Sequence, residues 1–159
     1  MNRTPKLNRP RTGRRGQSLV EFAVILPVFV LILVGIFDLG RAVYAYSTVN
    51  NAAREAGRLA IVDQTLAHIT AEATKQSVAL KPVTITVDFR DPSTPTTPNS
   101  CGTPITLGCV ADVLVDYTFY PATPMIDQLV GVIHIKGETQ FTVEALCVEP
   151  TQAQCPPGS

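Results

Sequence analysis

The chain has 159 residues and a formal net charge of zero, which leaves room for one small globular domain besides an anchor. The charge is unevenly distributed, because residues 1–15 hold six basic residues and no acid, whereas the rest holds seven basic and 13 acidic residues. A basic tail can bind nucleic acid, but a tail placed directly before an apolar run is more typical of a topology signal, so no nucleic-acid partner is expected.

The residues from Phe22 to Phe37 form a run without a single charge. This run is longer than the roughly 10–14 residues of a buried helix in a soluble protein. A secretory signal peptide is a second alternative, but no clear small-residue cleavage site follows, and Glu21 lies within the apolar segment. The sequence therefore predicts one membrane-spanning helix from about Leu19 to Leu39. The positive-inside rule puts its N-terminus in the cytoplasm and the rest of the chain on the other side of the cell membrane.

Small and apolar residues continue at helical spacing beyond this span and predict a stalk that runs to about Val62. Within it, Asp38 and Arg41 are three residues apart and can form an ion pair. Either the stripe packs on the chain's own C-terminal domain, or it joins a bundle with helices of other proteins, which we favour for the part nearest the membrane. The candidate helix-packing residues are Gly35, Gly40, Ala45, Val49, Ala52 and Ala56.

The C-terminal part predicts a short helix and three strands. Asp63–Thr65 marks a break, a second helix is expected over Leu66–Leu80, and Pro82 is expected to end it. Alternating patterns then predict strands at 83–90, about 110–120 and 132–147, with Gly137 as a bend or bulge and a short helix opening at Thr123–Pro124. The expected fold is α+β, in which a long N-terminal transmembrane and stalk helix precedes a small antiparallel three-stranded sheet. The second helix is expected to cover this sheet, and the upper stalk is a second candidate for the same role.

Four cysteines lie beyond the apolar span: Cys101, Cys109, Cys147 and Cys155. Four cysteines allow three pairings, and an oxidising exterior favours disulfides. The simplest pairing is local, Cys101 with Cys109 and Cys147 with Cys155. Free cysteines remain an alternative, whereas a metal site is disfavoured because no C-x-x-C spacing is present.

No pattern typical of an enzyme is found in the sequence. It has only two histidines, His68 and His134, and it lacks the serine-hydrolase, zinc-protease and phosphate-loop motifs. We therefore expect no catalysis, no cofactor, no metal and no small-molecule substrate.

Gly16, followed five residues later by Glu21 and then Phe22, resembles the processing motif of type IV prepilins. Together with Leu26–Pro27, the segment 35–41 and the segment 51–58, it is similar to the TadE-like family of pseudopilins from tight-adherence (Flp) pilus systems. The major Flp pilins usually carry tyrosine after the glutamate and are very short. Phe22 and the roughly 100 residues beyond the helix therefore favour a minor component.

The resemblance implies that a prepilin peptidase cuts between Gly16 and Gln17. With the break predicted at 63–65, this cut divides the chain into a leader (1–16), a transmembrane and stalk helix (17–62) and an extracytoplasmic domain (63–159). The implied partners are the membrane, the peptidase, a sister pseudopilin, the major pilin and the inner-membrane assembly platform. Two alternatives stay open: an uncut, membrane-anchored binding or adhesion module unrelated to pili, and a secreted domain that has lost the apolar run.

Overall fold

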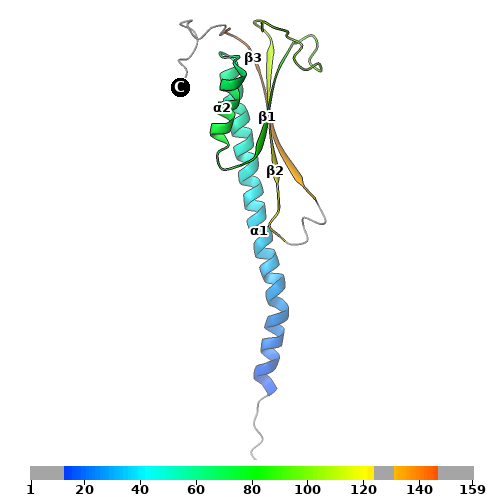
Figure 1. Cartoon of the computed structure of the whole chain (residues 1–159). Coiled ribbons are helices and arrows are strands. Elements are labelled where there is room, and N and C mark those ends of the chain that lie inside the picture. Colours follow the sequence, from blue (N-terminus) through cyan, green and yellow to red (C-terminus); the bar gives the residue numbers. More distant parts are fainter. Residues whose placement is uncertain (1–12, 124–130, 147–159) are drawn as a thin grey trace, which may run out of the picture.

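The structure, a computed structural model, describes residues 13–123 and 131–146. Two helices are followed by three strands (Figure 1), which confirms the expected α+β class. The elements are α1 (Gly13–Ala60), α2 (Leu66–Gln76), β1 (Val83–Arg90), β2 (Val110–Phe119) and β3 (Ile133–Thr142).

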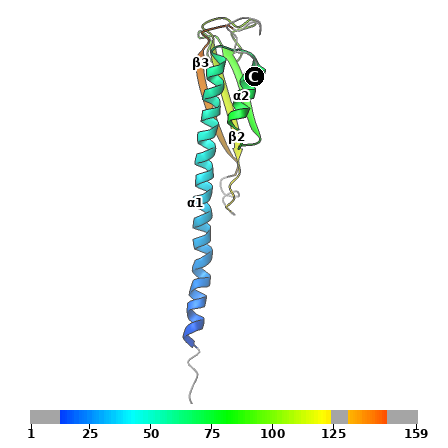
Figure 2. The same ribbon diagram turned by 90° about the vertical axis from the view of Figure 1, so that its left-hand side faces the viewer.

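Helix α1 is one continuous rod of 48 residues, about 70 Å long at 1.5 Å per residue. Pro27 lies inside it without ending it. The lower half of the rod projects free of the rest of the chain, and the sheet and α2 lie beside the upper half (Figures 1 and 2). The predicted stalk to Val62 is therefore confirmed apart from its last two residues, which form a turn.

The turn between the two helices is organised by Asp63. One carboxylate oxygen accepts the backbone N–H of Thr65 at 2.9 Å, and the other lies 2.6 Å from Nδ1 of His68. The predicted break at 63–65 is thus confirmed. Helix α2 ends at Gln76, four residues before the predicted end at Leu80, and Ser77 is its C-cap residue. The chain then makes a turn, in which the amide of Leu80 donates to the carbonyl of Ser77. Pro82 is not what ends it.

The sheet has the order β1-β2-β3, with both pairs antiparallel. The register runs without a break from Val110 opposite Thr142 to Phe119 opposite Ile133. The predicted bulge at Gly137 is therefore absent, since Gly137 pairs with Val115 in this unbroken register. Strand β1 matches its prediction, β2 stops at Phe119, and β3 is shorter than predicted because it ends at Thr142.

The hydrophobic core lies between the upper part of α1 and the sheet. Helix α1 contacts β2 and β3, whereas α2 lies against α1 and has a smaller contact with β1. The expectation that the second helix is the main cover of the sheet was therefore wrong. The fully buried face of α1 consists mostly of alanine: Ala45, Val49, Ala52, Ala53, Ala56 and Ala60.

A glycine permits this close packing of helix on strand. A Cβ built on Gly137 would lie 2.8 Å from the carbonyl oxygen of Val49 and 3.0 Å from the Cα of Asn50, which real side chains do not tolerate. Gly137 is therefore required because the backbones of α1 and β3 approach each other there.

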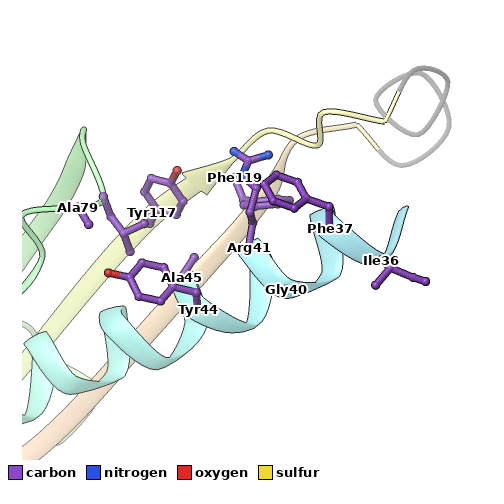
Figure 3. A pocket seen from close by; sticks show the side chains of 10 residues that line it. Ile36, Phe37, Gly40, Arg41, Tyr44, Ala45, Ala79, Tyr117 and Phe119 are labelled. Atoms are coloured by element: carbon purple, nitrogen blue, oxygen red, sulfur yellow. The ribbon is translucent and has the colours of Figure 1, made fainter. Parts of the chain in front are cut away.

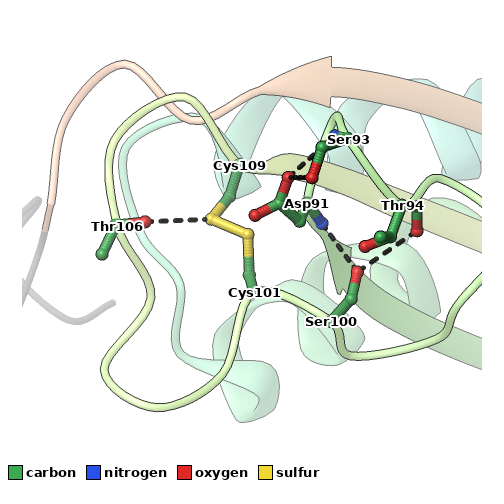
Figure 4. Close-up of a disulfide and its surroundings, with 7 residues drawn as sticks. All are labelled: Asp91, Ser93, Thr94, Ser100, Cys101, Thr106 and Cys109. Carbon is green, nitrogen blue, oxygen red and sulfur yellow. Dashed lines mark hydrogen bonds between the residues drawn. A yellow bond between two sulfur atoms is a disulfide. The ribbon is translucent and has the colours of Figure 1, made fainter.

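The loop between β1 and β2 is closed by a disulfide between Cys101 and Cys109, with a Cα–Cα distance of 6.1 Å (Figure 4). Asp91 and Ser100 organise the same loop, since the hydroxyl of Ser100 accepts the amide of Asp91 at 2.8 Å. This half of the predicted local pairing is confirmed. The other pair, Cys147 and Cys155, and the short helix predicted after Thr123–Pro124 lie outside the described residues.

Candidate functional site

The lower half of α1 exposes a continuous apolar surface. Within the part of the chain that the structure describes, α1 is the one helix long and apolar enough to cross a membrane. None of its most apolar window is buried by the rest of the protein. Its exposed large side chains include Leu19, Val20, Phe22, Val24, Ile25, Val28, Phe29, Leu31, Ile32, Leu33, Ile36, Phe37 and Leu39. Such a surface is costly in water and is suited to lipid.

The residues of the predicted processing motif lie together near the start of α1. Gln17 and Glu21 are one helical turn apart, and the Gln17 amide lies 3.5 Å from the Glu21 carboxylate. Gly16 has open space around its Cα, and Phe22 is exposed. All four residues of the motif are therefore accessible to another protein. The helix runs through Gly16 without interruption, so a peptidase that acts there must bind or unwind a helical turn.

The candidate helix-packing residues fall into two groups. Ala45, Val49, Ala52 and Ala56 are buried against the chain's own sheet, which is the first of the two alternatives given for the stripe. A Cβ at Gly35 or Gly40 would meet nothing within 4 Å. Of the six candidate residues, the two glycines are therefore the ones that remain open to contact with another helix.

Asp38 forms a site that sequence reasoning found only in part. Its predicted ion pair with Arg41 is confirmed at 3.0 Å. The carboxylate also accepts the amide of Ala122 at 3.0 Å, and both the amide and the hydroxyl of Thr123, at 2.7 and 2.6 Å. Asp38 is only 5% exposed. The aspartate at the end of the apolar run was visible in the sequence. Its bonds to Thr123 were not, because a partner 85 residues away leaves no local sequence pattern.

A groove of about 610 Å³ lies next to this site, between α1 and β2. Side chains from the two elements face one another across it (Figure 3). The Arg41 guanidinium lies 5.2 Å from the ring centre of Phe119, within the range of a cation–π contact. The remaining lining is largely apolar and includes Ile36, Phe37, Gly40, Tyr44 and Tyr117.

The face of the sheet that points away from α1 is polar and carries two charge groups. Arg90 contacts Asp112 at 2.7 Å and Asp88 at 3.3 Å, while Asp116 lies near both His134 and Lys136. Burial raises the pKa of the Asp112 carboxyl above its ordinary value, and the charge of Arg90 offsets this only in part. Among the described residues, no group of three histidine, cysteine or acidic side chains is placed to hold a metal ion.

These features define a class of protein: an α+β domain whose core is built on the upper half of a single helix, with the apolar lower half of that helix suited to crossing a membrane once. The family model described as TadE-like protein matches residues 16–58. The matched residues begin at Gly16 and end inside α1, so this segment of the chain is TadE-like and the resemblance is confirmed there. The match supports a component associated with Tad pili. No curated protein and no solved structure matches the chain.

Proposed function

We propose that the chain is a minor pseudopilin, a membrane-anchored structural component of tight-adherence (Flp) pilus assembly and the associated secretion, and not an enzyme. The observation that carries this proposal is the TadE-like segment 16–58. It starts at the predicted processing glycine and contains the exposed apolar half of α1. The domain from about residue 63 onward would project outside the cytoplasmic membrane, into the periplasm or the exterior.

Processing gives Glu21 a specific role in this proposal. A prepilin peptidase cuts after Gly16 on the cytoplasmic side, and the new amine on Gln17 is a cation at the edge of a hydrophobic environment. The Glu21 carboxylate of a neighbouring subunit pairs with it, which supplies both charges with a partner near lipid. Glu21 is exposed on α1, as this contact requires. The neighbours we propose are a sister pseudopilin, the major pilin and the inner-membrane assembly platform.

The deciding experiment is N-terminal sequencing of the membrane-bound protein from cells with and without the prepilin peptidase. We expect a start at Gln17 that depends on the peptidase. An intact N-terminus in both strains would favour the anchored binding module. A start beyond Phe37 would favour a secreted domain.

The role of Glu21 is tested separately by Glu21→Ala. We expect this variant to be cut and inserted normally but to fail in co-purification with the other pilus components. Glu55→Ala is the matched control, because Glu55 lies on the same helix and its carboxylate is paired with the neighbouring Arg58. Normal co-purification of Glu21→Ala would show that the carboxylate has no part in assembly.

A further inference from the structure

The membrane-side end of the sheet is held at a fixed level along α1. The Asp38 carboxylate accepts hydrogen bonds from the amides of Ala122 and Thr123. These two residues lie shortly after the end of β2 at Phe119. A span from Leu19 to Leu39 is about 31 Å long at 1.5 Å per residue, which matches a hydrocarbon core of about 30 Å. If the helix spans the membrane, the start of the β2–β3 connection therefore lies at the edge of that core.

The residues at this level are suited to the interfacial layer of a bilayer. Tyr120, just after β2, is 60% exposed, and Val132, just before β3, is 49% exposed. Tyr44 is also exposed, and it lies about 6 Å above Gly40 along the helix. The headgroup layer of one leaflet is about 5–8 Å thick, and tyrosine is enriched there because its ring is apolar and its hydroxyl is polar.

The groove beside Asp38 continues the lipid-facing surface of the helix. Ile36 and Phe37 line it and also belong to the apolar run, so apolar surface extends from the span into the groove without interruption. Gly40 leaves its floor open, and the rings of Tyr117 and Phe119 form the opposite wall (Figure 3). A lipid chain can therefore reach the groove along a continuous row of apolar side chains, with Arg41 as the one charged residue of the described lining.

From this geometry we infer that the domain rests on the bilayer through Tyr120 and Val132, which lie in the headgroup layer, and that the groove is filled by lipid of that leaflet. The occupant is bulk bilayer lipid and not a particular headgroup, since the one cation of the described lining, Arg41, is already bonded to Asp38. This inference rests on the membrane insertion in the proposed function. Its consequence is that the domain has two contacts with the membrane and a restricted tilt.

The natural sequence contains no tryptophan, so a single introduced tryptophan reports its own environment. The full chain carrying Tyr120→Trp or Val132→Trp is placed in phosphatidylcholine vesicles whose lipids are brominated either close to the headgroup or deep in the chain. We expect a blue-shifted emission that is quenched more strongly by the shallow bromines than by the deep ones.

Two matched variants separate the possible failures. Leu107→Trp replaces an exposed residue at the far end of β2, about 30 Å away, and should not be quenched. Phe29→Trp lies in the middle of the apolar run and should be quenched best by the deep bromines. If Phe29→Trp is not quenched, membrane insertion fails. If it is quenched while neither Tyr120→Trp nor Val132→Trp is, the helix spans but the domain does not touch the bilayer, and the inference is overturned.

Discussion

At the scale of single residues, Asp38 connects two parts of the chain that are distant in sequence. One carboxylate oxygen of Asp38 accepts the hydrogen bond from Ala122, and the other accepts those from Thr123. In Asp38→Asn one of these oxygens becomes an NH2 group that cannot accept, so the bonds of one of the two residues are lost. We expect faster hydrogen exchange at the amide of Ala122 or of Thr123, whichever has lost its acceptor, and a less stable domain. Asp91→Asn is the control, because the hydrogen bonds of the Asp91 carboxylate among the described residues come from Ser93 in the same loop, far from Asp38. Unchanged exchange at Ala122 and Thr123 would show that Asp38 does not hold this connection in place.

A second prediction at this scale concerns Gly137. Its missing side chain is replaced in the core by the backbone of Val49 and Asn50, which cannot rotate away. Gly137→Ala should therefore force α1 and β3 apart and lower the free energy of unfolding by about 1–3 kcal/mol, as overpacking does. Gly40→Ala is the matched substitution with open space around it, and we expect no loss there. Thermal unfolding of the full chain in detergent micelles, followed by circular dichroism, compares the two variants.

At the scale of elements, the turn between α1 and α2 depends on an ionised carboxylate. Burial raises the pKa of Asp63, but the hydrogen bonds with His68 and Thr65 outweigh it, and the pKa lies below the ordinary value. A lowered pKa means that the folded state prefers the charged form. This contribution to stability is present above the unfolded-state pKa of about 3.9 and is lost as the pH falls below it.

Asp63→Asn tests this dependence. We expect the variant to be less stable than the natural protein near neutral pH, and the difference in unfolding free energy to shrink as the pH falls below about 4. Measuring urea unfolding of both proteins from neutral to acidic pH gives this difference directly. A gap that stays constant through the acidic range would mean that the carboxylate charge contributes nothing to the turn.

The accuracy of sequence reasoning also differs between elements for physical reasons. The long helix and the strands are encoded by local periodicity, and their positions were predicted to within a few residues except at the end of β3. The end of α2 was missed because the proline at 82 gave the more obvious signal, whereas the helix has its C-cap at Ser77, where no glycine or proline marks it. Pairing of Cys101 with Cys109 was predictable because the two lie eight residues apart.

Contacts between distant segments were not predictable in the same way. Gly137 looks like a bulge in the sequence because the reason for a glycine, the close approach of α1, involves a residue far along the chain. The partner of the alanine stripe was left open for a related reason. A stripe of small residues indicates close packing but does not identify the surface it packs on. The family resemblance located the processing motif, and it gave no information on the contact of Asp38 with residues 122–123.

At the scale of the whole molecule, the anchor and the domain share one helix and cannot be divided at its end. Val49, Ala52, Ala53, Ala56 and Ala60 of α1 are completely buried, and the core of the sheet packs on them. A fragment of residues 63–159 would therefore expose the inner face of the sheet and should aggregate or remain unfolded. A fragment of residues 38–159 keeps both this helical face and Asp38 while losing the apolar run.

We expect the 38–159 fragment to be soluble and to unfold cooperatively on heating, with circular dichroism showing both helix and strand. The 63–159 fragment should show no cooperative transition under the same conditions, because the surface that covers β2 and β3 is missing. Cooperative unfolding of 63–159 would mean that the domain is complete without α1 and that the helix is a simple tether. Failure of both fragments would instead mean that the domain needs the bilayer contact as well. In that case a fragment of residues 17–159, placed in vesicles, should recover the cooperative unfolding transition.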